Sequence, residues 1–322
     1  MKRRNVVAGL LAGAGFAVTS GSLWQRATEI PMGDFAEEGL SSFSATLSFD
    51  PIQDSESGRR AVVSADVAAK VTQAATTVAN TGATSDTVAE KVRNFENEFA
   101  DDIYLPAAEQ PLLISTLLRM ERTQRFCGHG NFNLLGFDEM IKLAKNYSAI
   151  GAFLPEELAF IEKVFAVNAA EYGFLGEKVT GNLTATIKLA DTIKVPGSGH
   201  YLFKSQSLTH YDKLQKDVGQ SIILTSGIRS NVKQIHLFLA KASQSNFNMS
   251  KASRSLAPPG HSYHGIGDFD VGKIGFGASN FTDSFAETDE FKRMLDLGYI
   301  DLRYTVDNRI GVRFEPWHIK VV

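Results

Sequence analysis

The residues best suited to chemistry lie near the C-terminal end of the sequence, where two histidines and two aspartates fall between positions 261 and 270. His261, His264, Asp268 and Asp270 are interleaved with glycines, just where the pattern becomes strand-like. Imidazole nitrogens and carboxylate oxygens crowded in this way are typical of a zinc site that keeps a coordination position open. Alone, such a cluster is more often a surface hydrogen-bonded pair, so its interpretation depends on what accompanies it.

Two further blocks of polar residues flank this cluster. Ser226-Gly227-Ile228-Arg229-Ser230, followed by Gln234, precedes it, and Glu315-Pro316-Trp317-His318 follows it. In this order the three blocks resemble the VanY-type D-alanyl-D-alanine carboxypeptidases, zinc enzymes of the group that also includes lysostaphin and the hedgehog signalling domain. The resemblance covers roughly residues 200–322.

The resemblance implies a zinc site and a catalytic apparatus. It makes His264, Asp270 and His318 the Zn²⁺ ligands. Glu315 becomes the general base that takes a proton from zinc-activated water and delivers it to the leaving amine. Arg229 is expected to face the substrate carbonyl or carboxylate, where a guanidinium stabilises negative charge. The remaining substrate-binding positions are Gln234 and Ser262.

The central block departs from the family pattern, in which the zinc-binding His and Asp are seven residues apart. Here His264 and Asp270 are six apart, so Asp268 is an alternative ligand. Side chains two apart in a strand point to the same face, so alternation does not choose between the aspartates. The continuation Asp270-Val271-Gly272 favours Asp270. His261 is an alternative to His264, but only His264 keeps the family's spacing from Ser262.

The last block is intact. Glu315 and His318 are three apart and would lie on opposite faces of a regular strand, so we expect Pro316 to break the pleat and let both reach the metal. The family then continues with Arg-Tyr, whereas this chain has Lys320-Val321. Lysine keeps the charge but loses the bidentate fork of arginine.

The implied function is zinc-dependent hydrolysis of peptidoglycan stem peptides, with removal of the terminal D-alanine from D-Ala-D-Ala ends. The alternatives are an endopeptidase or L,D-carboxypeptidase on the same fold, or a non-catalytic zinc-containing domain that binds the cell wall. The net charge of -3 indicates no nucleic-acid or anionic-membrane partner. The single cysteine, Cys127, excludes an intramolecular disulfide framework.

The N-terminus is typical of an export signal over residues 1–22. A basic start, Lys2-Arg3-Arg4, precedes a short apolar run and small polar residues. Export places the protein in the periplasm or cell envelope. Arg3-Arg4 resembles a twin-arginine signal, and a general secretory signal is the alternative. An uncleaved signal anchor is the one membrane association that the sequence leaves open.

The rest of the sequence divides into regions that differ in the spacing of their apolar residues. Residues 23–58 lack a period and are interpreted as a linker or loosely packed lead-in, 59–197 as a mainly helical region of unknown role, and 198–322 as the zinc carboxypeptidase-like catalytic domain. The fold class is α+β, with a small antiparallel sheet and flanking helices in the catalytic domain. Apolar periods predict helices over 63–78, 88–99, from 111, 137–147, 155–172, 211–218, 232–242 and 287–297, strands over 222–225 and 268–271, and a hairpin of 302–306 with 310–314.

Overall fold

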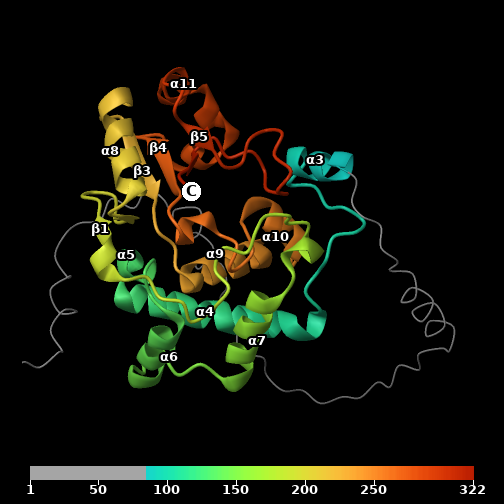
Figure 1. Ribbon diagram of the computed structural model, residues 1–322. Coiled ribbons are helices and arrows are strands. Elements are labelled where there is room, and N and C mark those ends of the chain that lie inside the picture. Colours follow the sequence, from blue (N-terminus) through green and yellow to red (C-terminus); the bar gives the residue numbers. More distant parts are fainter. Residues whose placement is uncertain (1–84) are drawn as a thin grey trace, which may run out of the picture. The chain divides into compact units, whose positions relative to one another are not determined.

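The computed structural model describes residues 85–322 (Figure 1). The predicted export signal, the lead-in over 23–58 and the predicted helix over 63–78 lie outside the described residues. Within the described part, no helix is long and apolar enough to cross a membrane.

The first part of the described chain is helical, as its apolar stripes predict. Leu113, Leu117 and Met120 are all buried on one side of the helix that begins beside Pro111, because their spacing places them on one face. The elements are α3 (Ser85–Arg93), α4 (Gln110–Cys127), α5 (His129–Phe132), α6 (Phe137–Asn146) and α7 (Pro155–Ala166), with 3-10 turns η1 (Ala107–Glu109), η2 (Ala169–Tyr172) and η3 (Leu189–Asp191).

Two predictions in this part are wrong in their bounds. The helix expected over 88–99 ends at Arg93, because the chain turns there and the Phe99 amide donates instead to the Asp102 carboxylate. The helix expected over 155–172 stops at Ala166 and resumes as the 3-10 turn η2, which Gly173 closes with φ of 84°.

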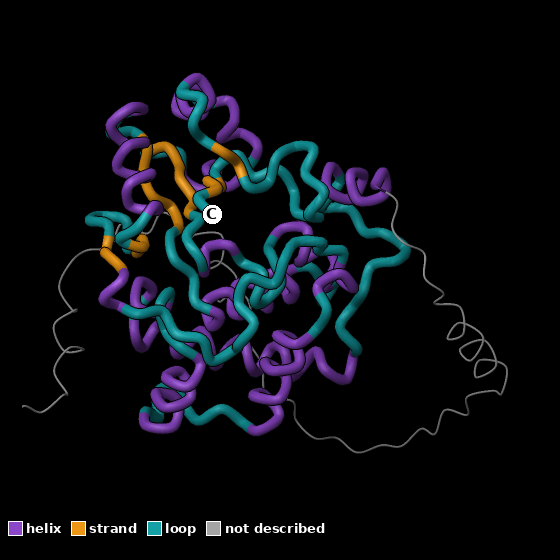
Figure 2. The backbone as a smooth tube through the Cα atoms, in the orientation of Figure 1, coloured by secondary structure: helices purple, strands orange, loops and turns teal. Residues whose placement is uncertain are grey.

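The second part combines helices with a small sheet, which confirms the α+β class (Figure 2). A two-stranded hairpin, β1 (Thr192–Lys194) with β2 (Tyr201–Phe203), precedes it. The main sheet is antiparallel throughout, in the order β3-β4-β6-β5. Its strands are β3 (Ile222–Ser226), β4 (Phe269–Lys273), β5 (Asp301–Leu302) and β6 (His318–Lys320), and the helices are α8 (Gln206–Val218), α9 (Asn231–Gln244), α10 (Met249–Ser255) and α11 (Asp289–Asp296), with 3-10 turns η4 (Tyr263–Gly265), η5 (Gly277–Phe281) and η6 (Asp283–Glu287).

The predicted hairpin of 302–306 with 310–314 is wrong. β5 pairs with β6 instead, and residues 303–317 form a loop. Inside this loop the Asn308 side chain donates to the carbonyls of Thr305 and Val312, which closes a turn in place of a ladder. The segment expected to be a strand therefore becomes a wall of the site described below.

Helix α9 is shared by both parts of the chain. Val232, Ile235 and Phe238 on α9 are buried in the same hydrophobic core as Leu113 of α4 and Ile161 of α7. A second core lies between the sheet, α8 and α11. The predicted division between residues 197 and 198 stays a prediction, while the packing shows that the helical region and α9 share one apolar core.

A buried ion pair fastens the segment after α3 to α10. Arg254 donates two hydrogen bonds to Asp102, at 2.6 and 2.9 Å, and both side chains are buried. Burial alone raises the pKa of the Asp102 carboxyl, but the hydrogen bonds from Arg254 and Asn248 hold that pKa below its usual value. Residues 95–102, called here the strap, are therefore held at a fixed place beside α10.

Candidate metal centre and active site

The first block, residues 226–230, begins at the end of β3, passes close to the backbone of Tyr201 and ends as the N-cap of α9. A Cβ on Gly227 would lie 2.1 Å from the Tyr201 carbonyl oxygen, so glycine is required there. The next amide, of Ile228, donates to the same carbonyl at 2.8 Å. Ser230 then caps α9, its hydroxyl accepting from the Lys233 amide. This geometry holds Arg229 between the sheet and α9.

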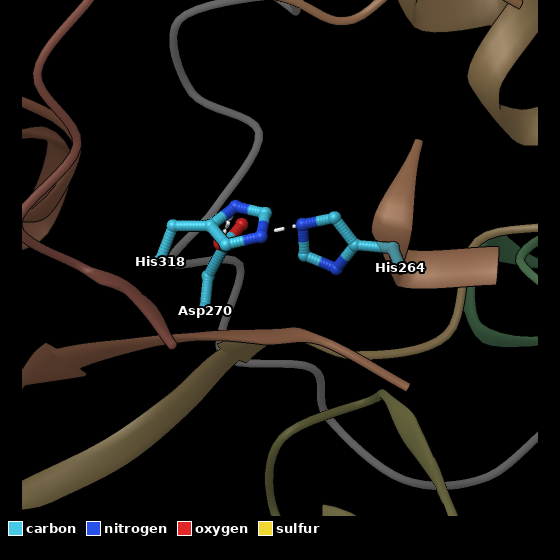
Figure 3. A group of neighbouring side chains, drawn as sticks. All are labelled: His264, Asp270 and His318. Carbon is cyan, nitrogen blue, oxygen red and sulfur yellow. Dashed lines mark ion pairs between the residues drawn. The ribbon is translucent and has the colours of Figure 1, made fainter. Parts of the chain in front are cut away.

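Strand register brings Asp270 and His318 together. They are directly paired on β4 and β6, so their side chains leave the same face of the sheet. His264 comes from the turn η4. One ligand atom from each of the three residues lies within 4.8 Å of the others, and Figure 3 shows the side chains converging. Asp270 Oδ1 is 3.3 Å from His264 Nε2 and 3.2 Å from His318 Nδ1.

The atoms that face one another here suit a cation. His264 Nδ1 lies 2.8 Å from the Gly227 carbonyl oxygen, so this nitrogen carries the proton and Nε2 presents a lone pair. Burial, with the charge of Arg229, lowers the pKa of His264 to about 4, which keeps the ring neutral. Buried His264 Nε2 and Asp270 Oδ1 both lack a well-aligned hydrogen-bond partner within the described chain. Buried lone pairs left facing one another in this way fit a bound metal ion.

His318 is held from both sides by carboxylates. Its Nδ1 faces Asp270 and lies 3.4 Å from Glu315 Oε2, while its Nε2 is 3.1 Å from Asp268 Oδ2. Burial alone lowers the pKa of His318, but the hydrogen bonds with these carboxylates raise it well above its usual value. Without a metal the ring is therefore protonated.

Asp268 is placed behind His318, away from the metal group. Arg303 donates two hydrogen bonds to its carboxylate, at 2.7 and 3.1 Å, and the Val321 amide donates a third. Burial raises the pKa of the Asp268 carboxyl, but the hydrogen bonds from His318 and Arg303 hold it well below its usual value. Asp268 thus fixes the tautomer and direction of His318, and Asp270 is the aspartate that joins the two histidines.

We expect Asp268→Asn to weaken Zn²⁺ binding by about 10–100-fold, because an outer partner that orients a ligating histidine typically has an effect of this size. The affinity is measured by titration against a competing chelator. Asp307→Asn is the control, since among the described residues that carboxylate accepts a hydrogen bond from the nearby Thr305 hydroxyl and does not contact His318. An unchanged affinity in Asp268→Asn would mean that Arg303 and β6 alone position His318.

The short spacing between His264 and Asp270 is accommodated by a tight turn. The amides of Ile266, Gly267 and Asp268 all lie within 3.2 Å of the Tyr263 carbonyl oxygen. Gly267 has a φ of 144°, which a residue with a side chain rarely adopts. The turn removes one residue from the connection without displacing Asp270 from its register with His318. His261 points elsewhere, with its Nδ1 3.0 Å from the Glu177 carbonyl oxygen.

Glu315 reaches the metal group because the chain turns before β6. The His318 amide donates to the Glu315 carbonyl at 3.2 Å, and β6 begins only at His318, which confirms the expected break in the pleat. Arg229 lies on the other side of Asp270, donating from Nη2 to Asp270 Oδ2 at 2.7 Å and from Nε to the Ser226 hydroxyl. It therefore orients the carboxylate while Oδ1 faces the histidines.

These groups line one cavity of about 380 Å³, a size suited to a small peptide. The positions named for substrate, Arg229, Gln234 and Ser262, all line it. Gln234 donates to the Ala257 carbonyl, and its Oε1 is buried with no partner in the described residues. The lining residues that the sequence did not indicate include Leu237, Lys241, Gln244, Tyr304, Val312 and Arg313.

Tyr304 is a lining residue that the sequence did not indicate and that contacts one of the histidines. Its ring packs edge-on against His318, with 4.9 Å between the ring centroids. Burial and the nearby charge of Glu315 raise the pKa of the Tyr304 phenol well above its usual value, so it stays a neutral donor. It comes from the loop that the sequence pattern predicted as a hairpin, so no periodic signal marked it.

Comparison with known proteins indicates the class of enzyme to which the protein belongs. The family model of D-alanyl-D-alanine carboxypeptidase, VanY, matches residues 203–322, and the protein is thus a metallopeptidase of the carboxypeptidase type. The matched residues, 203–322, include the three blocks whose motifs predicted a resemblance to this family.

Three solved structures are similar to the chain. The LdcB LD-carboxypeptidase has 24% identity and a TM-score of 0.34, over 42% of this chain and 70% of that chain. A mutant of the vancomycin-resistance D,D-pentapeptidase VanY in complex with Zn(II) has 21% identity and a TM-score of 0.32, over 41% and 78%. VanYB in complex with D-alanine-D-alanine has 19% identity and a TM-score of 0.34, over 46% and 84%. A comparison with curated proteins found no match.

Proposed function

We propose that the protein is a zinc-dependent peptidase that removes the terminal D-alanine from peptidoglycan stem peptides ending in D-Ala-D-Ala. The observation that carries this proposal is the convergence of His264 Nε2, Asp270 Oδ1 and His318 Nδ1 on one point beside Glu315, in a cavity of peptide size. The family match of residues 203–322 supports the substrate class.

His264, Asp270 and His318 fit Zn²⁺, since two neutral imidazoles and one carboxylate hold it with a net positive charge and an open position. When bound, zinc supplies positive charge that polarises a carbonyl group and makes water a better nucleophile at neutral pH. Glu315 lies beside this group, with Oε2 3.4 Å from His318 Nδ1. It takes the proton from the attacking water and passes it to the leaving amine.

The other named residues hold the substrate. Arg229 keeps Asp270 in place and presents positive charge to the cavity, where it stabilises the negative charge that develops on the attacked carbonyl. Gln234 offers its Oε1, which has no partner among the described residues, as an acceptor for a peptide amide, and Ser262 also lines the cavity. Tyr304, kept neutral by burial, adds a further donor at the cavity.

Mass spectrometry of a D-Ala-D-Ala-ending pentapeptide tests the proposal. After incubation with the zinc-loaded protein we expect loss of one alanine, sensitive to a chelator. A longer fragment would identify an endopeptidase instead, and cleavage only of a tetrapeptide with one terminal D-alanine would identify an L,D-carboxypeptidase. An intact set of peptides with stoichiometric zinc would indicate the non-catalytic binding domain.

We place the protein in the periplasm or cell envelope, because peptidoglycan lies there and residues 1–22 carry the pattern of an export signal. Export through a twin-arginine or a general secretory route fits Arg3-Arg4. The intact mass of the protein recovered from the envelope fraction tests whether the signal is removed. Recovery of the protein only from the cytoplasm would contradict the proposed location.

A further inference from the structure

The strap lies outside the part of the chain that matches the family, yet a residue inside that part binds it. Arg254 of α10 donates from Nε to the Phe95 carbonyl at 3.2 Å and from Nη2 to the Asn97 carbonyl at 2.8 Å. The same guanidinium pairs with Asp102. Because these charge-assisted hydrogen bonds come from one buried side chain, they fix the backbone of the strap on both sides of residue 96.

The fixed strap places the ring of Phe95 against Arg313, in the loop before β6. The guanidinium carbon of Arg313 lies 4.9 Å from the ring centroid of Phe95 and 4.9 Å from that of Trp317. Its Nη2 donates to the Phe281 carbonyl at 3.0 Å, and its backbone amide donates to the Arg254 carbonyl at 2.8 Å. Planar guanidinium groups pack on aromatic faces, so the two rings help to fix the position of this cation.

Arg313 faces the proposed general base. Its Nε is buried without a hydrogen-bond partner among the described residues, and Glu315 Oε1 lies 4.0 Å from it. The Arg313 side chain is 18% exposed and that of Glu315 is 10% exposed, so water screens their attraction less than it screens a surface pair. The other carboxylate oxygen, Oε2, lies 3.4 Å from His318 Nδ1. Glu315 therefore has one charged neighbour at each oxygen.

Only one of these two neighbours is independent of the metal. His318 Nδ1 is among the atoms proposed to hold zinc, so it does not serve Glu315 as a donor when the ion is bound. Arg313 is not a proposed ligand, and its guanidinium stays charged. Of the two neighbours, Arg313 is therefore the one that can hold the Glu315 carboxylate in the zinc-loaded protein.

We infer that the strap completes the active site, with Phe95 as a residue that positions Glu315 through Arg313. The inference rests on the proposed function, and it gives a segment before the family match a role in catalysis. A catalytic group displaced by about 1 Å can lose up to about 10²-fold in rate, so a contact that only fixes its place has a measurable effect.

Kinetics of the zinc-loaded protein test this role. Phe95→Leu should lower kcat for the pentapeptide about tenfold, because leucine has no aromatic face to hold Arg313. KM should change less than twofold, since Phe95 is not among the described residues that line the cavity. Rates are divided by the bound zinc, so that a loss of folded protein does not count. Phe95→Tyr, which keeps the ring, should retain most of the rate.

Phe99→Leu is the matched control. Phe99 is on the same strap and is also half-buried, but its ring lies against Arg254, with 5.0 Å between the ring centroid and the guanidinium carbon. This variant loses an aromatic contact of the same kind without touching Arg313. It should keep kcat within twofold of the wild-type value.

A double-mutant cycle shows whether Phe95 acts through Arg313. Arg313→Gln should lower kcat by at least as much as Phe95→Leu does. Adding Phe95→Leu to Arg313→Gln should then lower kcat no further, because the residue on which the ring acts is already gone. Losses that multiply in the double variant would show that Phe95 acts by another route and would overturn the inference.

A fluorine signal follows the same contact without substrate or zinc. The chain has two tryptophans, Trp24 and Trp317, so protein labelled with fluorotryptophan gives two signals, which Trp24→Phe assigns. Arg313→Gln should shift the Trp317 signal, because the guanidinium no longer packs on that ring. Phe95→Leu should shift it as well, and Phe99→Leu should leave it in place.

The outcomes separate this inference from the proposed function. A Phe95→Leu protein with the wild-type kcat, an unmoved Trp317 signal in that variant, or a loss of its zinc would overturn the inference and leave the proposed function standing. Failure of the zinc-loaded wild-type protein to cleave any stem peptide would overturn both.

Discussion

Glu315→Gln is expected to lower peptide hydrolysis by about 10²–10⁴-fold while the zinc content stays the same. The amide cannot accept the proton of the attacking water, and general-base catalysis typically contributes a factor of this size. Zinc should stay bound because Glu315 is outside the group formed by His264, Asp270 and His318. Product formation is followed by mass spectrometry, and zinc is quantified by elemental analysis of the same sample.

Glu290→Gln is the matched control for this prediction. The Glu290 side chain is 9% exposed, close to the 10% of Glu315, and pairs with Lys273 away from the cavity. Its replacement should leave hydrolysis near the wild-type rate. Activity in Glu315→Gln above a tenth of the wild-type rate would remove Glu315 from the mechanism. Loss of zinc from that variant would instead make Glu315 a ligand.

Removal of the metal should abolish hydrolysis, and added Zn²⁺ should restore it. Without zinc, His264 is neutral, the protonated His318 is held by the carboxylates of Asp268, Asp270 and Glu315, and Arg229 is engaged with Asp270. The positive charge that polarises the attacked carbonyl is therefore lost with the metal. The measurement compares chelated, dialysed and reconstituted protein on one pentapeptide. Full activity of protein shown to be metal-free would contradict the proposed mechanism.

The same site predicts how zinc binding depends on pH. The pKa of His318 is raised, so the metal-free ring carries a proton on Nδ1 that zinc must displace. Below that raised pKa, zinc affinity should rise by about tenfold per pH unit, with about one proton released per ion. Calorimetric titration in two buffers of different ionisation enthalpy counts the protons. A pH-independent affinity near neutrality would show that His318 is already deprotonated.

Short-range features of the fold follow from the sequence because their causes are local. Gly227 lets the backbone approach the Tyr201 carbonyl, and Ser230 caps α9. The conformation of the first block therefore follows from its own residue types. The α4 stripe of Leu113 and Leu117 is likewise local. Each needs only neighbours within a few residues, which a pattern of residue types can indicate.

The pairing of strands that are far apart in the sequence could not be predicted from the pattern of residue types. β5 pairs with β6 across the 303–317 loop, and alternation within 302–314 also suited a hairpin. The choice between Asp268 and Asp270 depended on the pairing of β4 with β6, because register with His318 places Asp270 between the histidines, while Arg303 binds Asp268. The roles of the site residues stay predictions, and the structure adds the partners that hold them.

Helix α9 separates an apolar core from the cavity. Ile235 and Phe238 face the helices of residues 110–166, while Gln234 and Lys241 line the cavity. Close-packed interiors transmit small shifts. A larger buried side chain on α4 would therefore push α9 toward the cavity and narrow it. Evolution could therefore change the length of peptide that the enzyme accepts through substitutions that never touch the peptide.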